Sequence, residues 1–308
     1  MLLDATASGV FSIAATPFLP DGALDRASID SLTDFYLDCG VAGLTILGIM
    51  GEAQKLEPEE ALAVSRQIIA RASVPVIVGV SAPGFTAMRS LACGVMELGA
   101  AGVMIAPPPH LRTDEQILTY YAQAVEVIGD DIPFVIQDYP LTLSVQMTPK
   151  VLREIVMAHP SCVMLKHEDW PGLEKISTLR AFQKEGTLRP LSILTGNGGL
   201  FLDFEMERGA DGAMTGYAFP DMLVETVKLM QAGERDKAHD LFDAHLPLIR
   251  YEQQQGIGLA ARKYVLKKRG AIAYDAQRKP GAQLSNTARA EIDYLLSRVA
   301  CRDPRASL

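Results

Sequence analysis

The sequence predicts a (β/α)₈ barrel followed by a helical extension, and three features support this prediction. Paired glycines beginning at Gly40, Gly99 and Gly209 each lead into a short apolar run. These positions stand 59 and 110 residues apart, which corresponds to two and four βα units of about 27 to 30 residues each. Further apolar runs alternate with helical segments between them. Eight such units are typical of a closed barrel.

The expected strands are nearly continuous apolar runs, as parallel strands covered by helices require. In chain order they span residues 11–16, 44–47, 75–80, 103–106, 133–137, 162–166, 191–195 and 213–215. Helix start signals occupy the gaps, at Pro58, Thr113 and Thr148. A doubly wound open sheet is the alternative. No glycine-rich dinucleotide or P-loop motif follows a strand, so nothing indicates a nucleotide.

After about residue 221 the pattern changes to helices alone, over residues 224–231, 234–252, 258–268 and 285–299. We therefore divide the chain into a barrel, residues 1–220, and a helical domain, residues 221–308. We expect this extension to pack on the barrel or to build a subunit contact. Its basic stretch from Arg262 to Arg269 is interpreted as the solvated face of one helix.

Composition excludes several classes of function. With a net charge of −8, an extended surface for nucleic acid or for anionic membranes is not expected. The four cysteines are far apart and form no metal-binding spacing, which suits a reducing compartment. The five histidines are scattered, so no zinc site is expected. No secretory signal and no membrane-length apolar run occur, and we expect a cytoplasmic protein.

Lys166 is the most informative single residue. It ends the apolar run of residues 162–165, and a lysine there is costly to bury unless it is paired, exposed or used chemically. Burial disfavours the ammonium form and so favours the free amine that attacks a carbonyl carbon. The alternative is a strand-end lysine that reaches out to solvent.

The strand ends carry the remaining polar groups, and in such barrels active sites lie at the carboxyl ends of the strands. Residues 48–52, which read Gly-Ile-Met-Gly-Glu, follow the second strand. Glycines there allow backbone N–H groups to point inward and hold a carboxylate. A tight turn with no ligand is the equally weighted alternative.

This layout resembles the dihydrodipicolinate synthase / N-acetylneuraminate lyase family of class I, Schiff-base-forming aldolases. The resemblance covers nearly the whole chain. Its motifs are residues 15–18 (Ala-Thr-Pro-Phe), the Gly-x-x-Gly-Glu turn of residues 48–52, Leu165 with Lys166, the Gly196 turn and the helical tail.

The resemblance implies a homo-oligomer, tetramer or dimer, with no metal or organic cofactor. Lys166 matches the lysine that condenses with pyruvate or a related 2-oxo acid. By the same resemblance, we expect the substrate to be bound at Ile49, Met50, Gly51, Met214 and Gly196.

The departures from the family pattern are as informative. Ile49 and Met50 stand where the family usually has hydroxyl residues, and Gln137 replaces the tyrosine that relays protons. Glutamine hydrogen-bonds but does not exchange a proton at neutral pH. Tyr139 lies two residues further on the same side of the strand. It is a candidate substitute in the catalytic set with Lys166 and Gln137, although a rim tyrosine facing outward is the alternative.

The arginine that lysine-pathway members use for a second carboxylate is also absent, because residues 141–143 read Leu-Thr-Leu. We therefore do not expect lysine-pathway synthase activity. His110, Asp138 and Asp169 remain as possible proton carriers, together with His167, which should point away from the barrel axis.

Two further residues follow Lys166 closely. Glu168 returns to the same side of the chain as Lys166, but we expect the chain to have left the strand there. Trp170 is expected to hold the start of the following helix or, alternatively, to roof the pocket.

The sequence thus predicts a Schiff-base lyase of aldolase, synthase or dehydratase type, acting on a 2-oxo acid and, in the aldol direction, an aldehyde. The apolar residues at the strand ends favour a hydrophobic or aromatic aldehyde, as in hydratase-aldolases of aromatic catabolism. A barrel that binds 2-oxo acids for regulation, with weakened catalysis, is the alternative from another class. A metal-dependent aldolase is disfavoured because no His/Asp/Glu cluster recurs at the strand ends.

Overall fold

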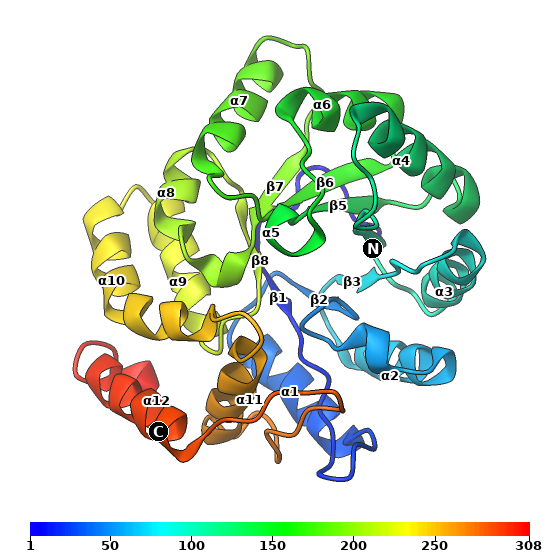
Figure 1. The fold of residues 1–308 in the computed structure, drawn as a ribbon. Coiled ribbons are helices and arrows are strands. Elements are labelled where there is room, and N and C mark those ends of the chain that lie inside the picture. Colours follow the sequence, from blue (N-terminus) through cyan, green and yellow to red (C-terminus); the bar gives the residue numbers. More distant parts are fainter.

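The computed structural model describes residues 1–308 and is a closed barrel of eight parallel strands surrounded by helices (Figure 1). Neighbouring strands pair in sequence order, and β1 closes the barrel by pairing with both β2 and β8. The predicted fold class is therefore confirmed. The strands are β1 (Gly9–Ile13), β2 (Gly43–Ile46), β3 (Val76–Gly79), β4 (Gly102–Ile105), β5 (Phe134–Asp138), β6 (Cys162–His167), β7 (Ser192–Thr195) and β8 (Gly212–Thr215).

The helices of the outer layer begin where the sequence indicates. The Thr113 hydroxyl accepts a hydrogen bond from the Gln116 N–H in a capping box, and the Thr148 hydroxyl accepts one from the Val151 N–H. Side-chain caps of this kind satisfy N–H groups that the first helical turn leaves free. The barrel helices are α1 (Arg26–Asp38), α2 (Pro58–Arg71), α3 (Phe85–Glu97), α4 (Asp114–Ile128), α6 (Pro149–Ala158), α7 (Leu173–Lys184), α8 (Leu202–Glu207) and α9 (Pro220–Gln231), with short helices η1 (Ala53–Lys55), α5 (Pro140–Leu143) and η2 (Asn197–Gly199) in the loops.

Two apolar cores hold the barrel. A large one lies between the strands and the helices. A small one of ten buried residues fills the interior of the barrel: Leu3, Phe11, Ile13, Ile77, Ala101, Met104, Val135, Met164, Leu194 and Met214. Each fully buried side chain of this size contributes about 1.5 to 3 kcal/mol. Because this inner cluster fills the barrel, polar groups are left to the carboxyl ends of the strands.

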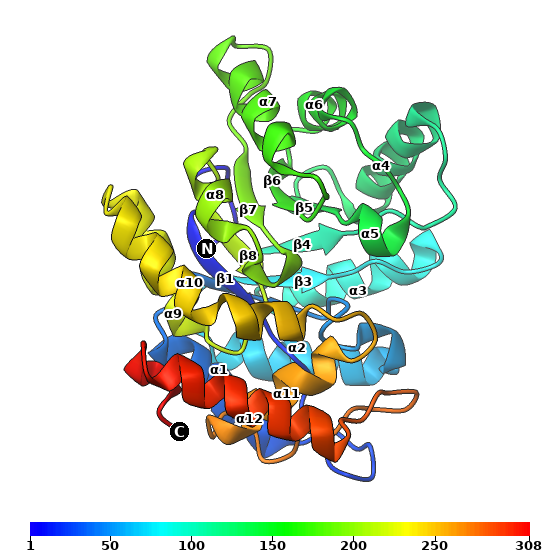
Figure 2. The same ribbon diagram turned by 60° about the vertical axis from the view of Figure 1, so that its left-hand side comes forward.

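Helix α9 begins at the division between barrel and extension that the sequence predicts, at residue 220. Helix α9 follows β8 and packs on β8 and β1, so it completes the eighth βα unit. The extension proper consists of α10 (Arg235–Glu252), α11 (Gly258–Lys268), α12 (Asn286–Ala300) and η3 (Pro304–Ala306). The sequence pattern could not separate α9 from these helices, because the chain has no strand between them. The extension lies against one side of the barrel (Figures 1 and 2).

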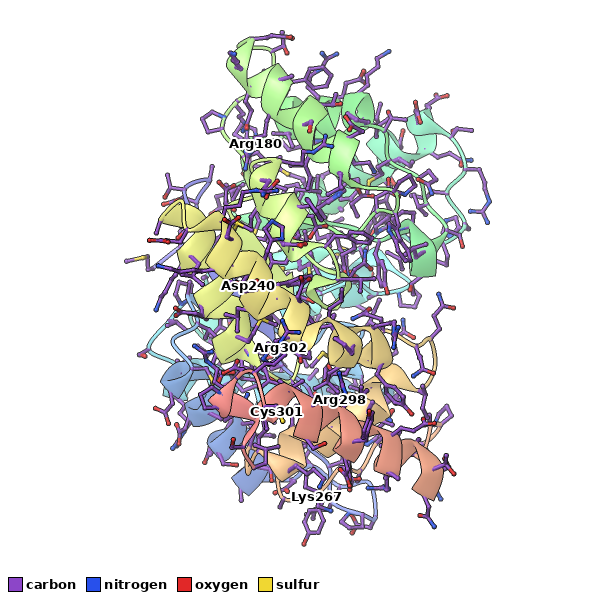
Figure 3. The ribbon with its side chains drawn as sticks, turned by 90° about the vertical axis from the view of Figure 1, so that its left-hand side faces the viewer. Arg180, Asp240, Lys267, Arg298, Cys301 and Arg302 are labelled. Atoms are coloured by element: carbon purple, nitrogen blue, oxygen red, sulfur yellow. The ribbon has the colours of Figure 1, made fainter.

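A buried polar chain attaches the C-terminal segment. The Tyr217 hydroxyl lies 2.8 Å from Nδ1 of His245, and Nε2 of His245 lies 2.9 Å from an Asp303 carboxylate oxygen. Burial lowers the pKa of His245, so its neutral form is favoured. Figure 3 shows Arg302, just past α12, beside Asp240 of α10, whose carbonyl it approaches at 3.5 Å. No helix in the structure combines the length and the apolar character needed to span a membrane.

Candidate active site

Lys166 lies on the inward face of β6 near the carboxyl end of the barrel. Met164, two residues earlier on the same face, belongs to the inner apolar cluster. Strand pairing sets Lys166 opposite Gln137 of β5. Both side chains are buried, with 4% and 3% of their surface exposed. The amine is therefore inside the barrel mouth, and the solvent-facing alternative is excluded.

Glu168 is the partner of this amine. Its Oε1 lies 2.7 Å from Nζ of Lys166, and the same oxygen accepts a hydrogen bond of 2.8 Å from Nε2 of Gln137. The Glu168 N–H donates to the Asp138 carbonyl at 2.8 Å, which continues the strand pairing one residue beyond β6. The strand itself ends at His167, as expected, and this single hydrogen bond keeps Glu168 extended beyond it. Lys166 and Glu168 share one face because side chains alternate along an extended chain.

Gly196 makes room for this carboxylate. It directly follows β7, and a Cβ built on it would lie only 2.6 Å from the Glu168 carboxyl carbon. Asn197 borders the same residue, since its Nδ2 donates to the Glu168 carbonyl at 2.9 Å and its N–H approaches Oε2 at 3.4 Å. The structure therefore assigns Gly196, expected to bind substrate, a supporting position for Glu168.

The turn after β2 offers free N–H groups. Leu47 and Glu52, which bound it, adopt left-handed φ angles of 55° and 53°. The N–H groups of Ile49, Met50 and Gly51 donate to no acceptor within the chain. The turn is tied down through its carbonyl groups, because the Thr16 hydroxyl donates to Gly51 O at 2.6 Å. Successive free N–H groups in such a turn form a concavity that suits an anion.

The two apolar residues of this turn differ in placement. The Ile49 side chain is 49% exposed, whereas Met50 is half-buried and packs on the inner cluster. A Cβ built on Gly216, just after β8, would overlap the Met50 sulfur. Met50 therefore points across the barrel mouth. Met214 lies in the buried inner cluster with Met164, so it contributes to the floor beneath Lys166.

Glu52 is held by the helical extension. Lys263 of α11 makes an ion pair with Glu52 and also donates to the carbonyls of Thr16 and Ala276, each at 2.8 Å. Lys55 contacts the second carboxylate oxygen at 2.8 Å. Lys263 is completely buried, and this burial lowers the pKa of its amine.

The interpretation of the basic stretch as a solvated face is therefore wrong in part. It holds for Lys267 and Lys268, whose side chains are 44% and 36% exposed. It fails for Arg262, Lys263 and Arg269, which are buried against the barrel or against α9. Only the packing of α11 onto the barrel separates these two groups.

Tyr139 lies at the edge of the site. It follows β5, is partly buried and opens α5. Burial raises the pKa of its hydroxyl, the nearby Glu168 carboxylate raises it further, and the Arg262 guanidinium opposes the shift. Both charges therefore act on this hydroxyl. The structure brings Tyr139 to the same side of the barrel as Glu168, and its predicted proton-relay role stays a prediction.

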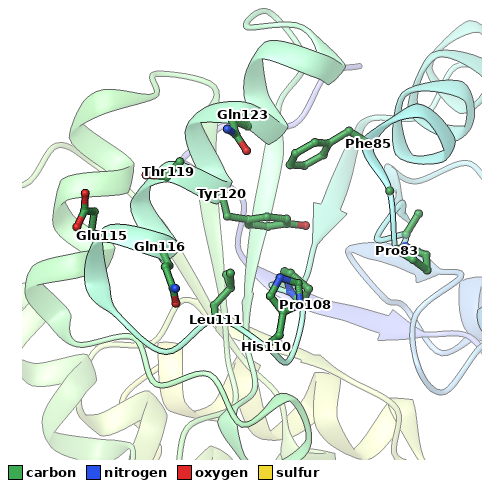
Figure 4. A pocket seen from close by; sticks show the side chains of 12 residues that line it. Pro83, Phe85, Pro108, His110, Leu111, Glu115, Gln116, Thr119, Tyr120 and Gln123 are labelled. Atoms are coloured by element: carbon green, nitrogen blue, oxygen red, sulfur yellow. The ribbon is translucent and has the colours of Figure 1, made fainter.

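His110 does not join this group. It is exposed and lines a pocket of about 450 Å³ between the loops after β3 and β4 and helix α4, together with Phe85 and Tyr120 (Figure 4). Neither Lys166 nor Glu168 lines this pocket.

The other possible proton carriers lie behind the barrel wall. As predicted, His167 faces away from the axis, and its Nε2 lies 3.1 Å from Gly172 O. Asp138 and Asp169 both pair with Lys175 of α7. Glu205 of α8 is also buried there, and burial raises its pKa to about 7. None of these groups makes a hydrogen bond or an ion pair with Lys166.

Trp170 contacts an aromatic residue of the neighbouring loop. Its ring is 49% exposed and meets Phe201 edge to face, with ring centroids 5.6 Å apart. Phe201 precedes α8, so this contact joins the loops after β6 and β7. Together with the exposed Ile49 and Leu141, Trp170 gives the loops at the carboxyl end an apolar surface.

The arrangement combines a buried amine, a carboxylate in hydrogen-bond contact with it and free backbone donors nearby. Such a set can form an imine with a carbonyl compound and move protons beside it. Sequence reasoning missed Glu168, although the alternation of side chains placed it beside Lys166. The structure contains no group of three or more His, Cys, Asp or Glu side chains that could hold a metal ion.

Comparison with known proteins agrees with this chemistry. The chain is 31% identical over 293 residues to L-2-keto-3-deoxyarabonate dehydratase of Azospirillum brasilense, and the aligned residues cover 92% of each protein. It is 29% identical over 234 residues to 4-hydroxy-tetrahydrodipicolinate synthase of Anaplasma marginale, strain Florida, and here the aligned residues cover 75% of each protein.

Among solved structures, a dihydrodipicolinate synthase from Rhodopseudomonas palustris is 71% identical. The two structures superpose with a TM-score of 0.96, and the match covers 97% of this chain and 99% of the Rhodopseudomonas palustris chain. The expectation that this chain lacks lysine-pathway synthase activity therefore finds no support, because so similar a protein bears that name. The model of the dihydrodipicolinate synthetase family matches residues 6–299. The chain belongs to this family of Schiff-base lyases.

Proposed function

We propose that the protein dehydrates a 3-deoxy-2-oxo acid through an imine on Lys166, with Glu168 as the proton carrier. The observation that carries this proposal is the 2.7 Å contact between the Lys166 amine and the Glu168 carboxylate. The likeness to the dehydratase of Azospirillum brasilense supports it. The absence of a tyrosine at position 137 then needs no separate explanation, because a carboxylate exchanges protons at neutral pH and an amide does not.

Imine formation begins with a proton transfer. Glu168 accepts a proton from the Lys166 ammonium, and the free amine attacks C2 of the 2-oxo acid. The carbonyl oxygen takes up protons and leaves as water, which yields a protonated imine on Nζ. The substrate carboxylate binds the free N–H groups of Ile49, Met50 and Gly51.

Dehydration follows from the imine. The positive nitrogen withdraws electrons, so Glu168 removes a proton from C3 and an enamine forms. The enamine expels the hydroxyl group at C4, and Glu168 returns its proton to this group, which leaves as water. Net loss of one water is balanced, and hydrolysis of the resulting imine frees Lys166. Gln137 holds the Glu168 carboxylate in place throughout.

Condensation of pyruvate with an aldehyde is the second candidate, favoured by the 71% identity to the Rhodopseudomonas palustris protein. The same enamine would attack an aldehyde carbon instead of expelling a hydroxyl group. The exposed apolar side chains of Ile49, Leu141 and Trp170 would suit a hydrophobic aldehyde. The alternative of a purely regulatory barrel was based on a missing proton carrier, and Glu168 can supply that carrier.

Borohydride trapping with pyruvate, followed by mass spectrometry, tests the imine. We expect one pyruvyl adduct on Lys166 and none in Lys166→Ala. Turnover is then compared for L-2-keto-3-deoxyarabonate, for pyruvate with aspartate semialdehyde, and for hydroxybenzylidene-pyruvate. Faster consumption of the first with release of water supports dehydration. Preference for either of the others replaces it with condensation or aldol cleavage, and failure to trap pyruvate overturns all three.

We further propose a homo-oligomer, dimer or tetramer, as the family resemblance implies. Light scattering of the purified chain tests this proposal, and a monomer mass at micromolar concentration contradicts it.

A further inference from the structure

We infer that Arg262, on α11 of the helical extension, recognises the oxygen-bearing end of the 2-oxo acid that lies farthest from its C1 carboxylate. This inference rests on the proposed imine at Lys166. It concerns the choice of substrate and not the chemical steps.

The first support is the position of the guanidinium. Nη1 of Arg262 lies 3.3 Å from the sulfur of Met50. Met50 in turn packs against Gly216 and the inner cluster of the barrel. Lys263, the next residue on α11, donates to the carbonyl of Thr16 just after β1 at 2.8 Å. Arg262 therefore reaches from the extension to the mouth of the barrel.

The second support comes from Tyr139. The Glu168 carboxylate raises the pKa of its hydroxyl and the Arg262 guanidinium lowers it, so both charges are near enough to act on Tyr139. Glu168 touches the amine of Lys166. Lys166 and Arg262 therefore belong to the same neighbourhood at the barrel mouth.

The third support is the number of unused donors. A guanidinium carries five N–H groups. In Arg262, Nε donates to a Glu252 carboxylate oxygen at 2.8 Å, and Nη2 makes a long contact of 3.4 Å to the Glu252 carbonyl. The Nη1 contact is to the Met50 sulfur, which is a weak acceptor. The side chain is 11% exposed, so bulk water satisfies few of these donors.

Glu252 holds the Arg262 side chain in place but leaves several of its N–H donors free. It is fully buried at the end of α10, and its Oε1 has no hydrogen-bond partner. Burial raises the pKa of Glu252 to about 7, and the Arg262 guanidinium opposes this shift. A positioned guanidinium with spare donors is suited to a hydroxyl or carboxylate of a ligand.

Borohydride capture on Lys166 measures recognition independently of turnover. The concentration for half-maximal capture is determined for 2-oxobutyrate, 4-hydroxy-2-oxobutyrate, 4,5-dihydroxy-2-oxopentanoate and 4-hydroxy-2-oxoglutarate. The last two carry a far hydroxyl and a far carboxylate, respectively. We expect the wild type to prefer at least one of them over 2-oxobutyrate, and Arg262→Ala to reduce that preference by about tenfold to 100-fold. Arg262→Lys should restore part of it.

Arg269→Lys is the matched control. Arg269 also belongs to the α11 segment and is buried and paired with a carboxylate, that of Asp221 at 2.7 Å. Arg262→Lys and Arg269→Lys each replace a guanidinium that is paired with a carboxylate, but only Arg262→Lys should change the preference among acids. Equal loss of capture for all four acids in Arg262→Ala, or an unchanged preference, overturns the inference. Capture without turnover would contradict only the proposed dehydration, and no capture in the wild type would remove both.

Discussion

The carboxylate of Glu168 lies 2.7 Å from the amine of Lys166 and is held there by Gln137. This contact places a proton acceptor beside the nucleophile before any substrate binds. It also explains how the site can dispense with a tyrosine at position 137. The three residues come from two adjacent strand ends, so the barrel frame itself determines their separation.

We expect Glu168→Gln to reduce kcat for the 2-oxo acid by about 10² to 10⁴-fold, because the amide keeps the shape of the side chain but carries no exchangeable proton. Imine capture of pyruvate should persist at a lower rate. Steady-state kinetics and trapping on the same preparation measure both quantities. Glu174→Gln, at an 83% exposed position on α7, is the control and should match the wild type. Turnover of Glu168→Gln within threefold of the wild type would show that the carboxylate is not the proton carrier.

Gly196→Ala tests the same carboxylate from its other side. The new Cβ would fall 2.6 Å from the Glu168 carboxyl carbon, so Glu168 must move away from Lys166. We expect kcat to fall at least about tenfold. Circular dichroism of the variant, compared with that of the wild type, establishes that it folds, since the backbone at Gly196 has φ −113° and ψ −131°, outside the β region that alanine prefers.

The control for this variant is Gly84→Ala. Gly84 is in extended backbone, at φ −136° and ψ 147°, and a Cβ there meets no atom within 4 Å. Its activity should equal that of the wild type. Similar activity of Gly196→Ala and Gly84→Ala would mean that Glu168 does not need its observed place.

The buried carboxyl of Glu205 predicts a specific dependence of stability on pH. Burial raises its pKa from 4.5 to about 7 in the folded chain. Between these values the folded state holds a proton that the unfolded state lacks, so the free energy of unfolding decreases as pH rises through this window. Below pH 4.5 the penalty is absent, and above pH 7 it is complete.

Glu205→Gln removes this titration while keeping the size of the side chain. Relative to the wild type, its free energy of unfolding should increase by on the order of 3 kcal/mol between pH 4.5 and pH 8. Urea unfolding at several pH values measures the difference. Glu185→Gln, at the exposed end of α7, should instead follow the wild-type curve in parallel. A constant difference for Glu205→Gln across this range would argue against a raised pKa.

The strands and most helices could be predicted from the sequence because their apolar patterns are local. The run of residues 162–166 became β6 (Cys162–His167), and residues 258–268 became α11 with the same bounds. Lys166 was identifiable for a similar reason, since a charge at the end of an apolar strand stands out. Glu168 was within reach of the same alternation, but the point at which a strand ends depends on its pairing with β5.

The contribution of the extension could not be predicted in this way. Arg262 and Lys263 are buried by the barrel mouth, whereas Lys267 on the same helix is 44% exposed. All three are basic, and helical periodicity says nothing about which face a distant barrel will cover. The packing of α9 on β1 and β8 is likewise invisible in the sequence pattern, and the division at residue 220 stays a prediction.

Lys263 therefore provides a test of how far the extension supports the site. Replacing it with methionine leaves the buried Glu52 carboxylate without its main partner, which typically costs about 3 to 5 kcal/mol. The melting temperature should fall, and KM for the 2-oxo acid should rise, because Lys263 also binds Thr16, whose hydroxyl holds the turn after β2.

Glu52→Gln combined with Lys263→Met should recover part of the stability, since no buried charge is then left unpaired. Lys267→Met, which breaks only the exposed pair with Asp275, should cost less than about 1 kcal/mol. If Lys263→Met and Lys267→Met lower the melting temperature equally, Lys263 does not anchor the turn.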